Sequence, residues 1–468
     1  MNYKKYCIDT IVLVLSTMAF LWPAFLNGFP LVFSDTGTYL SAAIEGFLPV
    51  DRPVHYSYLI YFFNEISKFW LIIFFQSLIV SYVLFITYKI LFKELNSICF
   101  LVIAFFLSLF TSLPWFASQI MPDIFSAIVI FAGGLLLVKK IELSYRIGLI
   151  FILIIVAPTH VSNFVIWGGM IIISLLHYQL VYKKIMSNIN MHKDTLCAFI
   201  LAIIILLAPH LIVNQKVAVS SASNVMLLGK LLDQGIALRY LDQYCQVDNL
   251  PICNQLTAIH SLKEKSEIEN LPIGFVSDQF LWGGIMSELG GLNQVSTYAS
   301  FINKQAIKNE PILFILKILN GFGNQIVHYK IGDTLMSFSN GSSFYENLKL
   351  YFPDYVNEYK KSIQYKGWGD LLIINKIYKW ILIISLLVIF CFYWLSKSTG
   401  LKIWSSFILV GVINNSLVTG GLSAVHDRYG SRVAWIFVLI ALFFVLDFIR
   451  QSKNNKNSFI IQNNLVHA

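Results

Sequence analysis

The segment "AVHDRYGSR" at 424–432 places four charge-capable side chains within seven residues, between two long apolar segments. Arginine binds phosphate and diphosphate groups through charge-assisted and often bidentate hydrogen bonds. We therefore predict that Arg428 and Arg432 bind a phosphate, and that His426 belongs to the same substrate-binding site. The alternative interpretation is a solvated turn.

A carboxylate lies in the polar stretch that follows the first apolar segment, "GFPLVFSDTGTYLSAAIEG". At a membrane boundary such a group can act as a general base toward a hydroxyl acceptor, so we predict that Asp35 is catalytic. Serine, threonine and glycine surround Asp35, and these residues are also typical of a helix N-terminus. A capping residue is therefore the alternative interpretation of Asp35.

Three further ionisable residues lie where apolar segments meet polar ones. Asp123 in "MPDIF" is predicted to be a second catalytic acid, with a first-turn helix acid as the alternative. Arg52 in "VDRPVHY" and His160 in "APTHVSN" are predicted to bind substrate. The alternatives are a surface ion pair between Arg52 and Asp51, and a His160 satisfied by backbone groups. Ionisable groups at a membrane boundary are costly, which makes all of these residues functional candidates.

The composition identifies the class of protein that must position these side chains. Hydrophobic residues make up 57% of the chain and charged residues only 13%, whereas a soluble domain has about a quarter charged. The net charge of +9 comes from short basic runs beside apolar segments. That arrangement is the orientation signal of a membrane protein and argues against a nucleic-acid partner.

Long apolar segments predict membrane spans. We expect an all-α polytopic membrane protein with about ten transmembrane helices, near 9–28, 70–90, 97–113, 121–138, 146–158, 161–179, 195–213, 376–396, 402–420 and 432–450. The chain then divides into a transmembrane module at 1–213 with an outer loop at 29–69, an extracytoplasmic, membrane-associated segment at 214–375, C-terminal transmembrane helices at 376–450 and a polar cytoplasmic tail at 451–468. Within the outer segment, 224–240 and 310–328 are predicted to be helices packed on the membrane surface.

Lysine and arginine collect in alternate connections between these spans, including Lys139, Lys140, Lys183 and Lys184. The short connections around 114–122 and 158–163 contain neither residue type. By the positive-inside rule both termini are cytoplasmic, and every candidate site residue lies on the outer side. We expect an integral protein of the bacterial inner (plasma) membrane, with its active site facing outside the cytoplasm.

Two cysteines, Cys245 and Cys253, flank a turn-forming stretch in "CQVDNLPIC" within the predicted outer segment. An oxidising compartment would allow a local disulfide bond between them. The alternative is a pair of unrelated thiols.

Together, a boundary carboxylate, nearby arginines and an apolar helical setting suit transfer of a sugar from a lipid-phosphate donor. The sequence contains no P-loop, GxGxxG, HExxH or paired CxxC pattern, so it supports no ATP, dinucleotide or structural zinc site.

The layout resembles the GT-C class of integral-membrane glycosyltransferases: seven spans, a long first outer loop with an acid near its start, and a large outer segment after the seventh span. The resemblance covers the architecture of residues 1–330. It implies membrane lipids and a polyprenyl-phosphate-linked sugar as partners, a glycan, lipid or protein as acceptor, and Asp35 as the active-site acid of the first loop. "SDTGTY" has no second acid two residues after Asp35, so an Asp-x-Asp metal site has no support and no metal ligand is predicted.

Two other function classes stay open at this point. A transporter or flippase of lipid-linked or small polar molecules would place charges at the bilayer midplane, often within internally repeated halves. The sequence shows no such repeat, and its charges collect at one boundary. A non-catalytic envelope assembly protein would suit the long outer segment but would leave the cluster at 424–432 unexplained.

Overall fold

The computed structural model describes residues 3–64, 69–93, 95–138, 141–182, 185–248, 250–333 and 335–466. Within these ranges the chain is helical, with one isolated β-bridge between Leu31 and Gln119. Lys139, Lys140, Lys183 and Lys184, which contribute to the predicted orientation, lie outside the described residues.

In the part of the chain that the structure describes, six helices are long and apolar enough to cross a membrane. They are α5 (Phe69–Leu91), α10 (Ser162–Tyr182), α11 (Ile185–Asn214), α22 (Leu372–Leu395), α23 (Thr399–Leu422) and α24 (Asp427–Val466). Each coincides with a predicted span, so the prediction of a helical membrane protein is confirmed.

The other predicted spans form shorter helices. Those at 97–113, 121–138 and 146–158 become α6 (Ser97–Phe110), α8 (Asp123–Val138) and α9 (Leu143–Val156), the last followed by the short helix η1 (Ala157–Thr159). The segment at 9–28 is divided between α1 (Tyr3–Ala19) and α2 (Trp22–Asn27). A proline ring clashes with the carbonyl group four residues before it, and α1 ends at Ala19, four residues before Pro23. The count of about ten spans stays a prediction for these shorter segments.

The predicted outer segment contains an apolar core of its own. The helices between 223 and 309 that surround this core are α12 (Ser223–Asp233), α13 (Ile236–Asp248), η2 (Pro251–Gln255), α14 (Leu256–Ile268), α15 (Phe275–Trp282), α16 (Ile285–Glu288) and α17 (Gly291–Asn309). They are called the α12–α17 cluster below. Apolar residues of α12 and α13, such as Leu228 and Leu241, are buried where these helices pack against α15 and α17. The prediction that 224–240 packs on the membrane surface is therefore wrong, because its apolar side chains are used inside this cluster.

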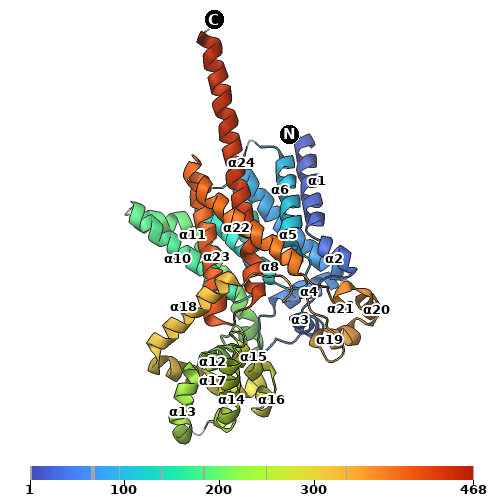
Figure 1. The fold of residues 1–468 in the computed structure, drawn as a ribbon, viewed down its shortest axis with the longest axis vertical. Helices are drawn as coiled ribbons and strands as arrows, with labels where there is room; N and C mark the ends of the chain where they lie inside the picture. Colours follow the sequence, from blue (N-terminus) through green and yellow to red (C-terminus); the bar gives the residue numbers. More distant parts are fainter. Residues whose placement is uncertain are drawn as a thin grey trace.

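The remaining helices are α3 (Ser34–Glu45), α4 (His55–Asn64), α7 (Leu113–Ala117), α18 (Pro311–Val327), α19 (Ser343–Tyr351), α20 (Pro353–Lys361) and α21 (Ile363–Lys366). Figure 1 shows the two chain ends at one end of the molecule and the α12–α17 cluster at the opposite end. The predicted topology requires this separation, because it puts the termini and the outer segment on opposite sides of the membrane.

Helix α18 crosses the end of α23 with the two backbones in contact. A Cβ atom added to Gly321 would lie 2.1 Å from the carbonyl oxygen of Gly420, and one added to Gly420 would lie 2.3 Å from the carbonyl oxygen of Gly321. Residues with a side chain cannot approach this closely. The segment predicted as a surface helix at 310–328 is thus fixed directly to α23, one of the helices long and apolar enough to cross a membrane.

We expect Gly321→Ala to lower the free energy of unfolding by about 1–3 kcal/mol, because the new methyl group overpacks this crossing. Gly323 lies on the same helix, and a Cβ atom added there would meet no described atom of another element within 4 Å, which makes Gly323→Ala the matched control. The control is expected to be neutral or to stabilise α18 by up to about 1 kcal/mol, because alanine favours helix. Thermal unfolding of the two purified variants in detergent measures the difference, and equal midpoints would contradict the close crossing.

The segment before α3 is held by two other parts of the chain. The backbone of Leu31 accepts a hydrogen bond from the amide of Ile120 at 2.8 Å and donates one to the carbonyl of Ser118 at 3.0 Å. The side chain of Gln364 bonds both the amide and the carbonyl group of Val32, at 3.0 and 2.7 Å. These bonds fix where α3 begins, and therefore where its first turn places Asp35.

Candidate functional site

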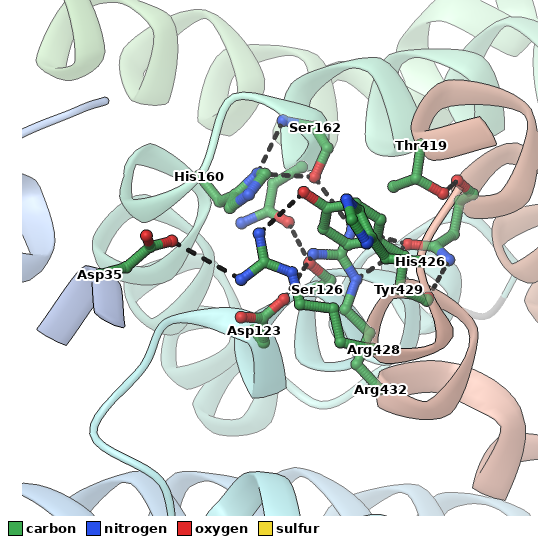
Figure 2. Close-up of polar contacts among 12 residues, drawn as sticks. Asp35, Asp123, Ser126, His160, Ser162, Thr419, His426, Arg428, Tyr429 and Arg432 are labelled. Carbon is green, nitrogen blue, oxygen red and sulfur yellow. Dashed lines mark hydrogen bonds and ion pairs between the residues drawn. The ribbon is translucent and has the colours of Figure 1, made fainter. Parts of the chain in front are cut away.

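Four helices begin close together at the candidate site. Their first turns carry Asp35 in α3, Asp123 in α8, Ser162 in α10 and Arg428 in α24, and Figure 2 shows these side chains gathered in one region. A helix N-terminus carries partial positive charge, because its first amide groups have no partner within the helix. The backbone at this site therefore favours bound anions.

Asp35 lies between two arginines from distant parts of the chain. One oxygen of its carboxylate, Oδ2, is 3.0 Å from Nη1 of Arg52 and 3.6 Å from Nη1 of Arg428. Both Nη1 atoms are buried, and in the described part of the chain neither has a partner in good hydrogen-bond geometry. The structure thus brings three of the predicted site residues together, around one carboxylate oxygen.

The N-cap residue of α3 is Phe33, and the neighbouring Thr36 bonds the backbone there. Its Oγ1 accepts a hydrogen bond from the amide of Phe33 at 2.9 Å and donates one to the carbonyl of Ile120 at 3.0 Å. Asp35 lies inside the first turn and is not the N-cap residue, so the structure does not give it the capping role that was the alternative interpretation. The carboxylate of Asp35 is therefore available to the arginines.

Each arginine is held in place by its other guanidinium nitrogens. Arg52 donates to the carboxylate of Asp51 from Nε at 3.1 Å and from Nη2 at 2.6 Å. Arg428 donates from Nη2 to the hydroxyl of Tyr429 at 2.9 Å, and its Cζ lies 4.6 Å from the ring centre of Phe33. The ion pair with Asp51, which was the alternative interpretation of Arg52, does form. It occupies only the edge of the guanidinium group that carries Nε and Nη2. Two anchored arginines thus each turn one unbonded nitrogen toward Asp35.

The two arginines also set the protonation state of Asp35. Burial raises its pKa, but the positive charges of Arg52 and Arg428 outweigh burial and hold the pKa below its usual range. Asp35 is therefore ionised at neutral pH, and it is a weak base as long as both arginines face it.

A second ion pair is fully buried beside the first. Nη1 of Arg432 lies 3.0 Å from Oδ1 of Asp123, and the two side chains are 0% and 3% exposed. Asn415 accepts hydrogen bonds from Nε and Nη2 of Arg432, at 3.1 and 2.8 Å, and Ser162 accepts one from Nη2 at 3.2 Å. Every guanidinium nitrogen of Arg432 thus has a protein partner. This geometry favours a positioning role for Asp123 and Arg432 over the predicted roles of acid and phosphate binder.

His160 is fixed in one tautomer by Ser162. The backbone amide of Ser162 donates to Nδ1 of His160 at 3.2 Å, so Nδ1 carries no proton and the hydrogen of the neutral ring lies on Nε2. Burial, together with the charge of Arg432, lowers the pKa of His160 to about 3. His160 is therefore neutral at physiological pH, and it can offer a hydrogen-bond donor but no charge.

Two residues of the site, Asp333 and Asn415, are absent from the sequence predictions. Oδ2 of Asp333 lies 4.0 Å from Nδ1 of His426 and accepts a hydrogen bond from the amide of Arg428 at 3.2 Å. Asn415 could have been found, because a polar side chain within an apolar span is costly and needs a reason. Asp333 could not, because it lies in a polar segment where nothing sets it apart from other acids.

A small recess opens next to Arg428. It is lined by Trp115, Phe116, Leu335 and the segment 330–333, which includes the charged side chains of Lys330 and Asp333. The recess therefore combines aromatic walls with a few charged side chains, which is the kind of lining that small-molecule sites have.

A mainly apolar crevice adjoins this recess. It is lined by Phe110 of α6, by Tyr378 and Leu382 of α22, by Ala434 of α24 and by Tyr329. The indole Nε1 of Trp115, in the wall of the first recess, donates a hydrogen bond to the hydroxyl of Tyr378 at 3.1 Å. The apolar crevice and the charged recess are therefore neighbours.

Cys245 and Cys253 are joined by a disulfide bond within the α12–α17 cluster. Among the side chains that the structure describes, no group of three His, Cys, Asp or Glu residues is arranged to hold a metal ion.

No protein-family model, no curated protein and no solved structure matches the chain. Its function has to be inferred from the geometry and the chemistry of this site.

Proposed function

We propose that this protein is an integral-membrane glycosyltransferase of the GT-C type, which transfers a sugar from a polyprenyl-phosphate-linked donor to a cell-envelope acceptor outside the cytoplasm. One observation carries the proposal: the carboxylate of Asp35 faces two anchored arginines, Arg52 and Arg428, that each keep one unbonded nitrogen. A base and two phosphate-binding donors therefore lie within reach of a single bound donor molecule.

In the proposed reaction, the hydroxyl oxygen of the acceptor attacks C1 of the sugar. The bond between C1 and the phosphate oxygen breaks, and the lipid phosphate leaves with the bonding electrons. Arg52 and Arg428 stabilise the negative charge on this phosphate. Asp35 accepts the proton of the attacking hydroxyl group.

The crevice beside the site supports a lipid-borne donor. Its walls come partly from α22, a helix of which almost no residue is buried inside the protein, as expected of a helix that faces lipid. A polyprenyl chain in this crevice would bring its phosphate toward the recess that contains Arg428.

Phosphate binding through Arg428 gives a direct test. We expect Arg428→Gln to weaken the binding of polyprenyl phosphate about tenfold to a hundredfold, because it removes a charge-assisted hydrogen bond. Binding is measured with the purified full-length protein in nanodiscs of neutral lipid. Arg239→Gln is the matched control, because Arg239 is 61% exposed and pairs only with Glu310 among the described residues. If wild type and Arg428→Gln bind the lipid phosphate equally, the proposed donor site is wrong, and binding without sugar transfer would favour lipid translocation instead.

The disulfide bond provides a test of the proposed orientation. In an extracytoplasmic, oxidising compartment we expect Cys245 and Cys253 to be bonded, since cytosolic reductants would keep them as thiols. A maleimide reagent should then modify four cysteines of the denatured, unreduced protein and all six after reduction. Six modified cysteines before reduction would contradict an extracytoplasmic α12–α17 cluster.

A further inference from the structure

The two unbonded nitrogens of the site have the same neighbour. Nη1 of Arg52 and Nη1 of Arg428 both form ion-pair contacts with Oδ2 of Asp35, at 3.0 and 3.6 Å, but among the described residues neither atom has a partner in good hydrogen-bond geometry. Buried ion pairs are stable when hydrogen bonds accompany the charges. The contact between Asp35 and the arginines is therefore an ion pair of poor hydrogen-bond geometry, and a ligand with better-placed oxygens could bond both Nη1 atoms more favourably.

A phosphate would satisfy both donors. It presents more than one acceptor oxygen, and arginine matches the geometry of such groups. The other edges of the two arginines are fixed by Asp51 and by Tyr429, so the arginines are already arranged for a ligand. A phosphate that bonds both Nη1 atoms would have to lie where the carboxylate of Asp35 lies now.

We propose that Asp35 occupies the phosphate position in the ligand-free protein, and that the phosphate of the donor displaces its carboxylate from Arg52 and Arg428. This inference rests on the proposed function. It implies an order of events: the donor binds first, and its phosphate takes over the two positive charges that weaken Asp35 as a base. Asp35, released beside a new negative charge, then becomes a stronger base for the acceptor hydroxyl.

Removing the charge of Asp35 tests the displacement. The probe is polyprenyl phosphate, and its dissociation constant is measured for the full-length protein in nanodiscs of neutral lipid. We expect Asp35→Asn and Asp35→Ala each to bind about tenfold more tightly than the wild type, because no carboxylate competes for the arginines. Asp51→Asn is the control: it removes the same charge beside Arg52, but from the edge that anchors the guanidinium group.

The inference stands if both Asp35 variants tighten binding and Asp51→Asn tightens it less or weakens it. It is overturned if the Asp35 variants bind the lipid phosphate as weakly as the wild type or more weakly, or if Asp51→Asn has the same effect as Asp35→Asn. Failure of the proposed function looks different, because then neither the wild type nor any variant binds the lipid phosphate. Unfolding midpoints close to that of the wild type confirm that each variant is folded.

Discussion

The Asp35→Asn variant is expected to transfer sugar about 100- to 10,000-fold more slowly than the wild type, the usual contribution of a general base. Asparagine has nearly the same shape as aspartate but cannot accept the proton of the acceptor hydroxyl group. Transfer is measured in proteoliposomes with a panel of polyprenyl-phosphate sugars, and kcat and the KM for the donor are determined separately. Because Asp35 also competes with the phosphate, kcat should fall while the KM for the donor stays the same or decreases.

Two further variants show whether this loss is specific. Asp35→Glu keeps the carboxylate on a longer side chain and should retain part of the activity. Asp354→Asn changes an exposed acid in α20 and should leave transfer unaltered. An Asp35→Asn protein that keeps more than about a tenth of the wild-type rate would exclude Asp35 as the general base and leave it as a binding residue.

The membrane helices could be predicted because their signal is local. In α5, α10, α11, α22, α23 and α24 the apolar residues needed to cross a bilayer are consecutive. The stretch at 224–240 gave a similar but weaker signal, and composition alone does not distinguish a helix buried against α15 and α17 from one that lies on a membrane. Periodicity predicts which residues are apolar, but the surface that covers them depends on distant parts of the chain.

The site was predictable residue by residue but not as an arrangement. Asp35, Arg52 and Arg428 are costly at a membrane boundary, and that cost identifies each of them as a candidate. Their meeting around one oxygen depends on the position of α3, which Gln364 fixes from 332 residues away in sequence. The partner of Asp123 is almost as distant in sequence, since Arg432 lies 309 positions after it. Sequence spacing carries no information about contacts at such separations.

The buried pair of Asp123 and Arg432 leads to the largest expected effect on stability. We expect Arg432→Met to lower the free energy of unfolding by about 3–5 kcal/mol, the usual result of leaving one charge of a buried pair unpaired. The variant leaves Asp123, whose side chain is 3% exposed, without its countercharge, and it removes three hydrogen bonds to Asn415 and Ser162. The unfolding midpoint of the purified protein in detergent measures the loss.

Arg146 offers a matched control for this prediction. It pairs with Asp194 at 2.9 Å, about the same distance, but both side chains are more than a third exposed. Arg146→Met should therefore cost no more than about 1 kcal/mol, because water already solvates the two charges. If both variants lower the midpoint equally, burial does not distinguish the pairs, and Arg432 is not the residue that holds α24 to α8. If only Arg432→Met lowers it, the buried pair of Asp123 and Arg432 stabilises the fold more than the exposed pair does, as its burial predicts.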